Sequence, residues 1–310
     1  MSFEFTGGTD NRSESEIEQR EKLKQEFSLA LCTKQKEGGT ADLESQASFV
    51  EQVHPSGVQF DFRNRSIEEI EKALETLKSL RERMPEMSFS IHGDTPKIDE
   101  QNFGMKNHER TEKELEILQL LQADTYTVHP PSVSEKLFSE AQPEIQEKII
   151  DAYCGMFASK ISDAIQNGGK FSIAIENMPT KGEDGAWGQR VEDIDRLMRR
   201  TSEILVEKYE VDPAIVGEYI GATLDVNHTI HDLPSEEMNT VLDGWFRGLG
   251  EYLKVVHLYT PSNAGPEFSD KYKLVLDLAS KYNPNARLYL ESKQDEETTR
   301  NVFAAAKEIE

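Results

Sequence analysis

Eight short runs rich in β-forming residues alternate along this chain with longer segments of helical pattern. Such alternation is typical of an α/β protein with a parallel sheet, because two parallel strands need a long crossover between them, usually a helix. Each run therefore predicts one strand. In chain order they are FSLALCT (27–33), GVQFDF (57–62), MSFSIH (87–92), DTYTVH (124–129), KFSIAIE (170–176), GATLDV (221–226), YLKVVHL (252–258) and ARLYLES (286–292).

Helical periodicity fills most of the intervals between these runs. The clearest case is SIEEIEKALETLKSLRERM (66–84), where Ser66 and Glu69 are spaced as a capping box before apolar residues at helical intervals. The other predicted helices cover roughly 109–122, 134–166, 190–209, 235–250, 269–282 and 295–309.

Eight strand and helix alternations in 310 residues predict a (β/α)8 barrel, the α/β fold known as the TIM barrel. The alternative is an open, doubly wound sheet, which usually carries a glycine-rich phosphate turn after an early strand. No GxGxxG or GxxxxGK[ST] motif occurs in this chain. We therefore expect one barrel domain over 27–310, preceded by an N-terminal helix or arm over 1–26.

The composition limits the partners of this barrel. With 58 acidic and 35 basic residues the net charge is −23, which argues against nucleic acid as the main partner, although a locally basic groove stays open. Solubility in a salt-rich cytoplasm is the simpler reason for such acidity. No apolar run approaches the length of a membrane span, and the acidic N-terminus does not resemble a signal peptide, so we expect a cytoplasmic protein. Cys32 and Cys154 stand in apolar contexts and are predicted to be buried free thiols.

Six consecutive predicted strands, from the third to the eighth, end in or near a side chain that can bind a metal. Successive members of this set lie 37, 47, 49, 32 and 34 residues apart, each the length of one strand, loop and helix. In a barrel they would converge at the carboxyl-terminal mouth, where such enzymes have their active sites. The six residues are His92, His129, Glu176, Asp225, His257 and Glu291.

The two faces of these strands differ in character, because residues two apart share a face. The face that ends in each candidate is small and hydroxylated, as in Ser88, Ser90 and His92 or Thr125, Thr127 and His129. The opposite faces are bulky and apolar. This pattern predicts a narrow, partly polar interior that leads to a site. A single such residue would more often be a satisfied core side chain, but six in register indicate function.

The candidate ligands are imidazoles and carboxylates without a thiolate. Such a set suits Zn²⁺, Mn²⁺, Co²⁺ or Mg²⁺ and does not choose among them.

The motifs SIHG, TVHPP, IENMP, LDVNH, VVHL and YLES, in this order, resemble the xylose isomerase-like TIM barrel superfamily. This superfamily contains sugar isomerases and epimerases, among them enzymes of sugar phosphates, together with endonuclease IV. The resemblance runs from about residue 27 to 292. It implies one metal bound by Glu176, Asp225, His257 and Glu291. In the endonuclease IV branch it implies a second metal at His92 and His129, with Glu176 as the bridge.

Two features bear on the choice between these branches. The endonuclease IV branch completes a third metal site, to which His228 would contribute, with an Asp-x-His pair after the seventh strand. The corresponding stretch here, HLYTPSNAGPEFSDKYK, has no His after its first residue. In the isomerase and epimerase branch the residue at His228 contacts the substrate instead, and that role remains available.

We therefore expect a metal-dependent sugar or sugar phosphate isomerase or epimerase that acts on a small molecule. The resemblance assigns proton transfer to Glu176 and Glu291, while His228 and His129 would orient substrate oxygens. The first alternative is a metal-dependent phosphodiesterase acting on abasic DNA. The second is a non-catalytic barrel that binds a metal or a sugar acid. The sequence leaves the substrate, its phosphorylation, the metal and the oligomeric state open, a homo-oligomer included.

Residues in the loops give further candidates for substrate binding. Trp187, in a glycine-rich stretch, is a candidate lid that packs on a sugar, or alternatively packs on a neighbouring loop. Lys181 is a candidate contact for an anionic group, or alternatively a solvated side chain. Asn177, directly after Glu176, is a third candidate. We expect Arg63 to pair with Asp61, its alternative being the neutralisation of an anionic substrate.

Overall fold

A computed structural model describes most of the chain. The described residues are 27–31, 43–63, 65–99, 101–181, 185–230, 233–259, 266–292, 299–301 and 304. The expectations for 1–26, for Cys32 and for most of 295–309 lie outside this part of the chain.

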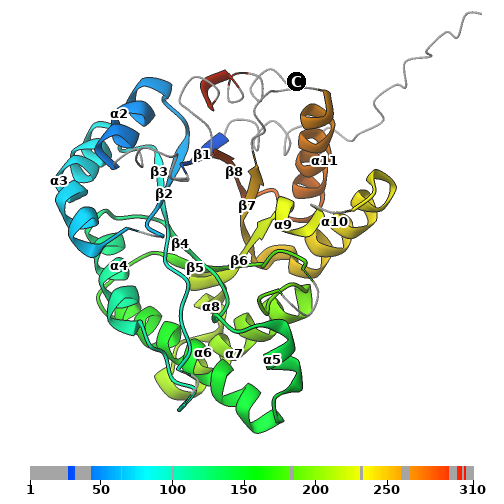
Figure 1. The fold of residues 1–310 in the computed structure, drawn as a ribbon. Helices are drawn as coiled ribbons and strands as arrows, with labels where there is room; N and C mark the ends of the chain where they lie inside the picture. The colour runs from blue at the N-terminus through cyan, green and yellow to red at the C-terminus, as the bar shows by residue number, and fades with distance from the viewer. Residues whose placement is uncertain are drawn as a thin grey trace, which may run out of the picture.

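Eight parallel strands pair in chain order, and β8 pairs with β1 to close the barrel (Figure 1). Every strand coincides within two residues with one of the predicted runs. The predicted (β/α)8 barrel is therefore confirmed. The strands are β1 (Phe27–Leu31), β2 (Gly57–Asp61), β3 (Ser88–His92), β4 (Thr125–Val128), β5 (Ser172–Glu176), β6 (Ile220–Asp225), β7 (Leu253–Tyr259) and β8 (Arg287–Ser292).

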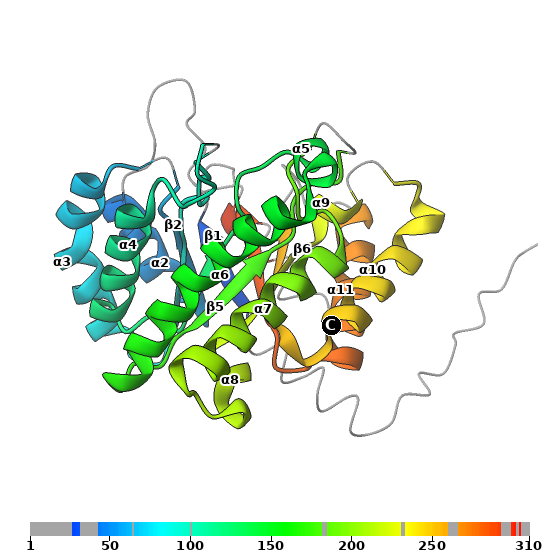
Figure 2. The ribbon, with the colours of Figure 1, turned by 90° about the horizontal axis from the view of Figure 1, so that it is seen from below.

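Helices surround the barrel (Figure 1). Two short ones, α5 and α9, lie at the end where the strands finish, and α8 lies at the opposite end (Figure 2). Among the described helices, none has the length and apolarity needed to cross a membrane. The helices are α2 (Leu43–Val53), α3 (Ile67–Arg83), α4 (His108–Leu120), α5 (Glu135–Glu140), α6 (Pro143–Gln166), α7 (Val191–Tyr209), α8 (Pro213–Tyr219), α9 (Val226–Ile230), α10 (Ser235–Leu249), the 3₁₀ turn η2 (Gly250–Tyr252) and α11 (Pro266–Tyr282).

The predicted helix over 134–166 is wrong as a single element. It is broken into α5 and α6, because Pro143 starts a new helix and disfavours helical geometry in the residue before it. Gln142 accordingly has extended dihedral angles of −58° and 145°. The first piece starts at Ser134, whose hydroxyl accepts a hydrogen bond of 3.1 Å from the amide of Leu137.

Three helices were not expected from the sequence. Helix α2 buries Leu43, Ala47 and Val50, whose spacing of four and three residues is a helical signal. Helix α8 starts at an Asp-Pro pair, and the carboxylate of Asp212 accepts a hydrogen bond of 2.9 Å from the amide of Ala214. Helix α9 is a single short helix of five residues directly after β6, too short for a periodic pattern.

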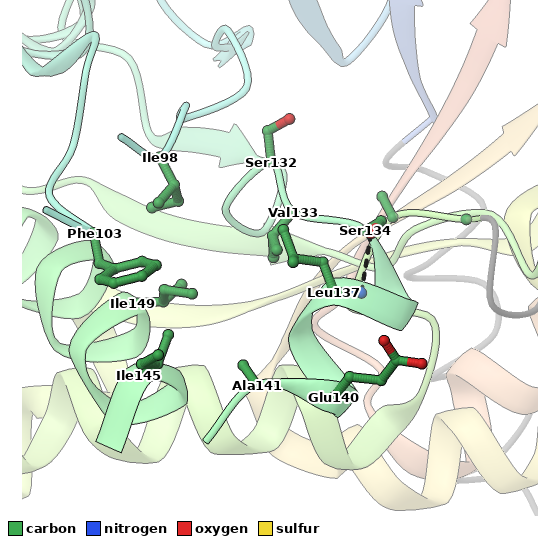
Figure 3. A pocket seen from close by; sticks show the side chains of 12 residues that line it. Ile98, Phe103, Ser132, Val133, Ser134, Leu137, Glu140, Ala141, Ile145 and Ile149 are labelled. Carbon is green, nitrogen blue, oxygen red and sulfur yellow. Dashed lines mark hydrogen bonds between the residues drawn. The ribbon is translucent and has the colours of Figure 1, made fainter. Parts of the chain in front are cut away.

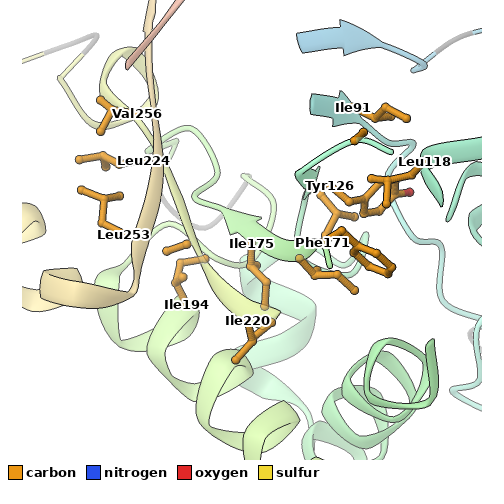
Figure 4. Close-up of a cluster of buried hydrophobic side chains, with 14 of the residues drawn as sticks. Ile91, Leu118, Tyr126, Phe171, Ile175, Ile194, Ile220, Leu224, Leu253 and Val256 are labelled. Atoms are coloured by element: carbon orange, nitrogen blue, oxygen red, sulfur yellow. The ribbon is translucent and has the colours of Figure 1, made fainter. Parts of the chain in front are cut away.

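The main core lies between the outer faces of the strands and the surrounding helices (Figure 4). Ile175 and Leu224 from the strands and Leu118 and Ile194 from the helices are all fully buried. Cys154 on α6 is a buried free thiol, as expected, and burial raises its pKa to about 12. The apolar faces read from the sequence therefore face outward from the barrel.

The interior of the barrel is polar along much of its length. Thr127 accepts a hydrogen bond of 2.9 Å from Gln59 and shares one of 3.2 Å with Thr223, which links β2, β4 and β6. The hydroxyls of Ser90 and Tyr289 share another of 2.7 Å. Small hydroxyl side chains thus fill the narrow interior and satisfy one another.

Replacing Leu224 by Ala should lower the free energy of unfolding by about 2–5 kcal/mol, because it empties part of a fully buried site between strand and helices. Urea unfolding followed by circular dichroism measures this change. Leu120→Ala is the matched control, since that side chain is 55% exposed and its loss should change the free energy by less than about 0.5 kcal/mol. Equal losses at the two positions would contradict the assignment of the core.

Candidate metal centre

The six residues at the strand ends come together at one mouth of the barrel. Each lies within two residues of the carboxyl end of its strand, and none is more than 8% exposed. The set combines three imidazoles and three carboxylates, and it consists of His92 (β3), His129 (after β4), Glu176 (β5), Asp225 (β6), His257 (β7) and Glu291 (β8).

Glu176 lies at the centre of this cluster. Its Oε2 is 2.6 Å from Nε2 of His92 and 3.3 Å from Nε2 of His129. Its Oε1 is 3.2 Å from Nδ1 of His257 and 3.9 Å from Nδ1 of His228. Burial alone would raise the pKa of Glu176, but the charges of His92 and His257 and the hydrogen bonds to His129 and His257 hold it well below its usual range. Glu176 is therefore an ionised carboxylate, suited to be a ligand and poorly suited to be a base.

Two of the imidazoles are oriented by main-chain carbonyl groups. Nδ1 of His92 donates to the carbonyl of Gly93 at 3.1 Å, and Nδ1 of His228 donates to that of Asn177 at 2.8 Å. In a neutral imidazole such a bond uses the single proton, and Nε2 then keeps its lone pair. Nε2 of His92 and the carboxylate oxygen of Glu176 would then both be electron-pair donors at 2.6 Å. A cation, whether a proton or a metal ion, is needed between them.

His129 is oriented by two side chains, those of Thr95 and Arg63. Its Nδ1 is 2.8 Å from the hydroxyl of Thr95, and Nη1 of Arg63 is 3.5 Å from its Nε2. Burial is the main reason that its pKa is lowered to about 4, and the nearby charges of His92 and Arg63 lower it further against the opposing effect of Glu176. His129 is therefore neutral at ordinary pH, the form that binds metal ions.

The ligand atoms form two groups that share Glu176. One consists of His92, His129 and Glu176, the other of Glu176, Asp225 and His228, and in each group the atoms lie within 4.8 Å of one another. Three nitrogen and oxygen donors at this spacing fit a divalent ion with open positions.

His257 and Asp225 show why a cation fits here. Nε2 of His257 is buried and has no hydrogen-bond partner among the described residues. Burial lowers the pKa of His257, but the negative charges of Glu176, Glu291 and Asp225 outweigh it and the pKa is raised. Burial raises the pKa of Asp225, and the charges of Glu291 and Glu176 add to this effect against that of His228. An unpartnered nitrogen beside crowded carboxylates is the environment that a metal ion would relieve.

Asn177, a predicted substrate contact, forms hydrogen bonds within the chain. It is fully buried, and its Oδ1 accepts a hydrogen bond of 2.7 Å from the amide of Asp225. Its Nδ2 donates to the carbonyl of Asp225 at 3.2 Å and to the hydroxyl of Thr229 at 3.1 Å. Asn177 therefore connects the end of β5 to the end of β6 and orients Asp225.

Trp187 and Lys181 have contacts with residues outside the cluster. The ring of Trp187 is 1% exposed and stacks on Phe138 of α5 with a centroid distance of 4.1 Å. This is packing on a neighbouring loop, so the expectation of a lid ring over a sugar is corrected. Lys181 is exposed, and its amide donates to the side chain of Gln189 at 2.8 Å.

Arg63 forms the expected pair with Asp61 and also reaches the cluster. Its Nε and Nη2 each lie 2.9 Å from the carboxylate of Asp61, and its Nη2 lies 3.7 Å from Oε1 of Glu291. The sequence signalled this placement only by the position of Arg63 just after the second strand. Thr95, which orients His129, carried no signal in the sequence.

A separate cavity of about 830 Å³ lies beside the segments that follow β3 and β4 (Figure 3). Apolar side chains dominate its wall, among them Phe103, Val133 and Ile149. None of the candidate ligands lines it.

No family model and no curated protein sequence matches this chain. Solved structures do match its fold. Endonuclease IV from Thermus thermophilus is 20% identical over 91% of this chain and 99% of that one, with a TM-score of 0.53. A putative xylose isomerase from Rhodospirillum rubrum is 14% identical over 86% and 93%, with a TM-score of 0.59. A D-allulose 3-epimerase from Methylomonas sp. is 10% identical over 92% and 93%, with a TM-score of 0.57. The chain thus has the fold of the xylose isomerase-like TIM barrels.

Replacing Glu176 by Gln should weaken the binding of Mn²⁺ or Zn²⁺ by at least about 10-fold. Loss of a residue that is only hydrogen-bonded to a metal ligand commonly has an effect of this size, and loss of the ligand itself should have no smaller one. Isothermal titration calorimetry of the metal-free protein measures the affinity. Glu82→Gln, at an exposed position of α3, removes the same charge away from the cluster and should leave the affinity unchanged. Equal affinities in all three proteins would exclude Glu176 as a ligand.

Proposed function

We propose that this chain is a divalent-metal-dependent isomerase or epimerase of a small sugar or sugar phosphate. Glu176, Asp225, His257 and Glu291 would hold the ion, as the resemblance in sequence implies. The fold it shares with isomerases, epimerases and endonuclease IV supports an enzyme of this kind without naming the reaction. The cytoplasmic location and the small-molecule partner remain parts of the proposal.

The charge balance at the mouth is the observation that carries this choice. Arg63 is the cation that the described structure places against the cluster, and Asp61 accepts hydrogen bonds from its Nε, its Nη2 and its main-chain amide. The positive charge of Arg63 is thereby largely neutralised. A phosphodiester backbone needs cations that are not already paired, whereas a sugar offers hydroxyl and carbonyl oxygens to a metal. The site suits the second class of substrate better.

When bound, a divalent ion would polarise the carbonyl and an adjacent hydroxyl of the sugar. The chain's own residues supply the proton transfer. A two-sided transfer needs two such groups, Glu176 and Glu291, and we assign the role of base first to Glu291, since the imidazoles around Glu176 hold its pKa well below its usual range. His228, of which 21% of the side chain is exposed, would orient a substrate oxygen.

A metal-dependent phosphodiesterase is the second candidate. Glu176 has one pair of histidines at each oxygen, His92 and His129 on one side and His257 and His228 on the other. Two ions would be held by the two groups of ligand atoms that share Glu176, and their charge would offset the negative charge of the mouth. A non-catalytic barrel that binds a metal or sugar acid is the third candidate, and absence of turnover together with tight ligand binding would favour it.

A panel of ketoses and ketose phosphates, assayed with Mn²⁺ or Co²⁺, should reveal isomerised or epimerised product by chromatography. Glu291→Gln should reduce kcat by about 10²–10⁴-fold, the usual contribution of a general base. Chelation should abolish turnover, and Glu82→Gln should leave it unchanged.

Cleavage of an oligonucleotide with an abasic site, together with two or more metal ions per chain and no turnover of sugars, would replace this proposal by the phosphodiesterase.

A further inference from the structure

A second polar cluster lies on the outer side of the barrel wall, behind the candidate centre. Arg110 and Glu114 are one turn apart on α4, and Glu114 is fully buried. Nε of Arg110 is 3.0 Å from Oε1 of Glu114 and 3.2 Å from the carboxylate of Asp94. Within the described part of the chain, the polar partners of Arg110 and Glu114 are Phe62, Arg65, Asp94 and Tyr126 and each other, not the candidate ligands.

Arg110 binds the segment that follows β2. Its Nη1 donates to the carbonyl of Arg65 at 2.7 Å and its Nη2 to that of Phe62 at 2.8 Å. These two residues flank Arg63, whose guanidinium contacts His129 and Glu291 at the mouth. The guanidinium of Arg110 therefore fixes the main chain on both sides of Arg63.

Glu114 binds the segment that follows β3. Its Oε2 accepts a hydrogen bond of 3.1 Å from the amide of Asp94 and one of 2.6 Å from the hydroxyl of Tyr126. Asp94 lies between Gly93, whose carbonyl orients His92, and Thr95, whose hydroxyl contacts His129. The glycine is required, because a Cβ at that position would lie 1.9 Å from the hydroxyl oxygen of Tyr126.

The buried carboxylate of Glu114 is unfavourable for the stability of the fold, because it loses its hydration. Burial raises the pKa of Glu114 to about 7, even though the hydrogen bond from Tyr126 and the charge of Arg110 oppose the shift. An apolar side chain would fill the same space without that desolvation. What an apolar side chain cannot do is hold the amide of Asp94 and the guanidinium of Arg110 together.

We infer that Arg110 and Glu114 are positioning residues of the centre, acting through the main chain at Phe62 and Arg65 and of 93–95 on Arg63, His92 and His129. This rests on the proposed metal-dependent function. Partners behind the ligands of a metal site fix the direction of the ligand atoms and thereby the affinity for the ion.

The test uses Co²⁺, because its visible absorption reports the geometry of its ligands. Arg110→Lys keeps a positive charge beside Glu114 but cannot donate to two carbonyl groups at once. We expect it to weaken Co²⁺ binding by about 10-fold and to change the absorption spectrum. Lys113→Gln is the matched control on the same helix, where Lys113 pairs with Glu71 and Glu116, and it should change neither. If Arg110→Lys does not fold, Glu114→Gln gives the same test, since it keeps an acceptor for Asp94 but loses the charge pair.

An unchanged Co²⁺ affinity and spectrum in a folded variant, with or without a lower melting temperature, would overturn the inference and leave the cluster a structural one. A parent protein that binds no Co²⁺ would overturn both the centre and the inference. A parent that binds Co²⁺ but converts no sugar would overturn only the proposed reaction, because the Co²⁺ measurements still decide the role of Arg110 and Glu114.

Discussion

The burial of one carboxylate, that of Glu176, is the constraint on which the mouth of this barrel depends. An ionised carboxylate that is 1% exposed is strongly unfavourable unless positive charge or several donors surround it. Here four imidazoles, those of His92, His129, His228 and His257, lie within 3.9 Å of its oxygens. They can do so only because the closed barrel brings the ends of β3, β4, β6 and β7 around the end of β5.

The groups around these imidazoles make the arrangement specific. Main-chain carbonyls accept hydrogen bonds from Nδ1 of His92 and His228, and the hydroxyl of Thr95 lies 2.8 Å from Nδ1 of His129. Nε2 of each ring then faces a carboxylate. Asn177 orients Asp225 by binding both its amide and its carbonyl. Because these groups already orient the ligand side chains, the side chains need to move little when an ion binds.

Strand order and strand faces could be predicted because they depend on local patterns with a period of two residues. The six strand-end residues followed from that pattern alone, since closure of a parallel barrel places all strand ends at one mouth. The roles of Asn177 and Trp187 could not be predicted in this way. Both depend on contacts between residues distant in sequence: Asn177 with Thr229, Trp187 with Phe138. The contact of Arg63 with Glu291 was not expected, because it depends on how β8 closes against β1 and on the loop after β2.

The most direct test of this account is a crystal structure of the protein grown with Zn²⁺ or Mn²⁺, with anomalous scattering used to locate the ions. We expect an ion bonded to Glu176 and at least two of Asp225, His257 and Glu291. Clear density for the six strand-end side chains without an anomalous peak at Glu176 would contradict it.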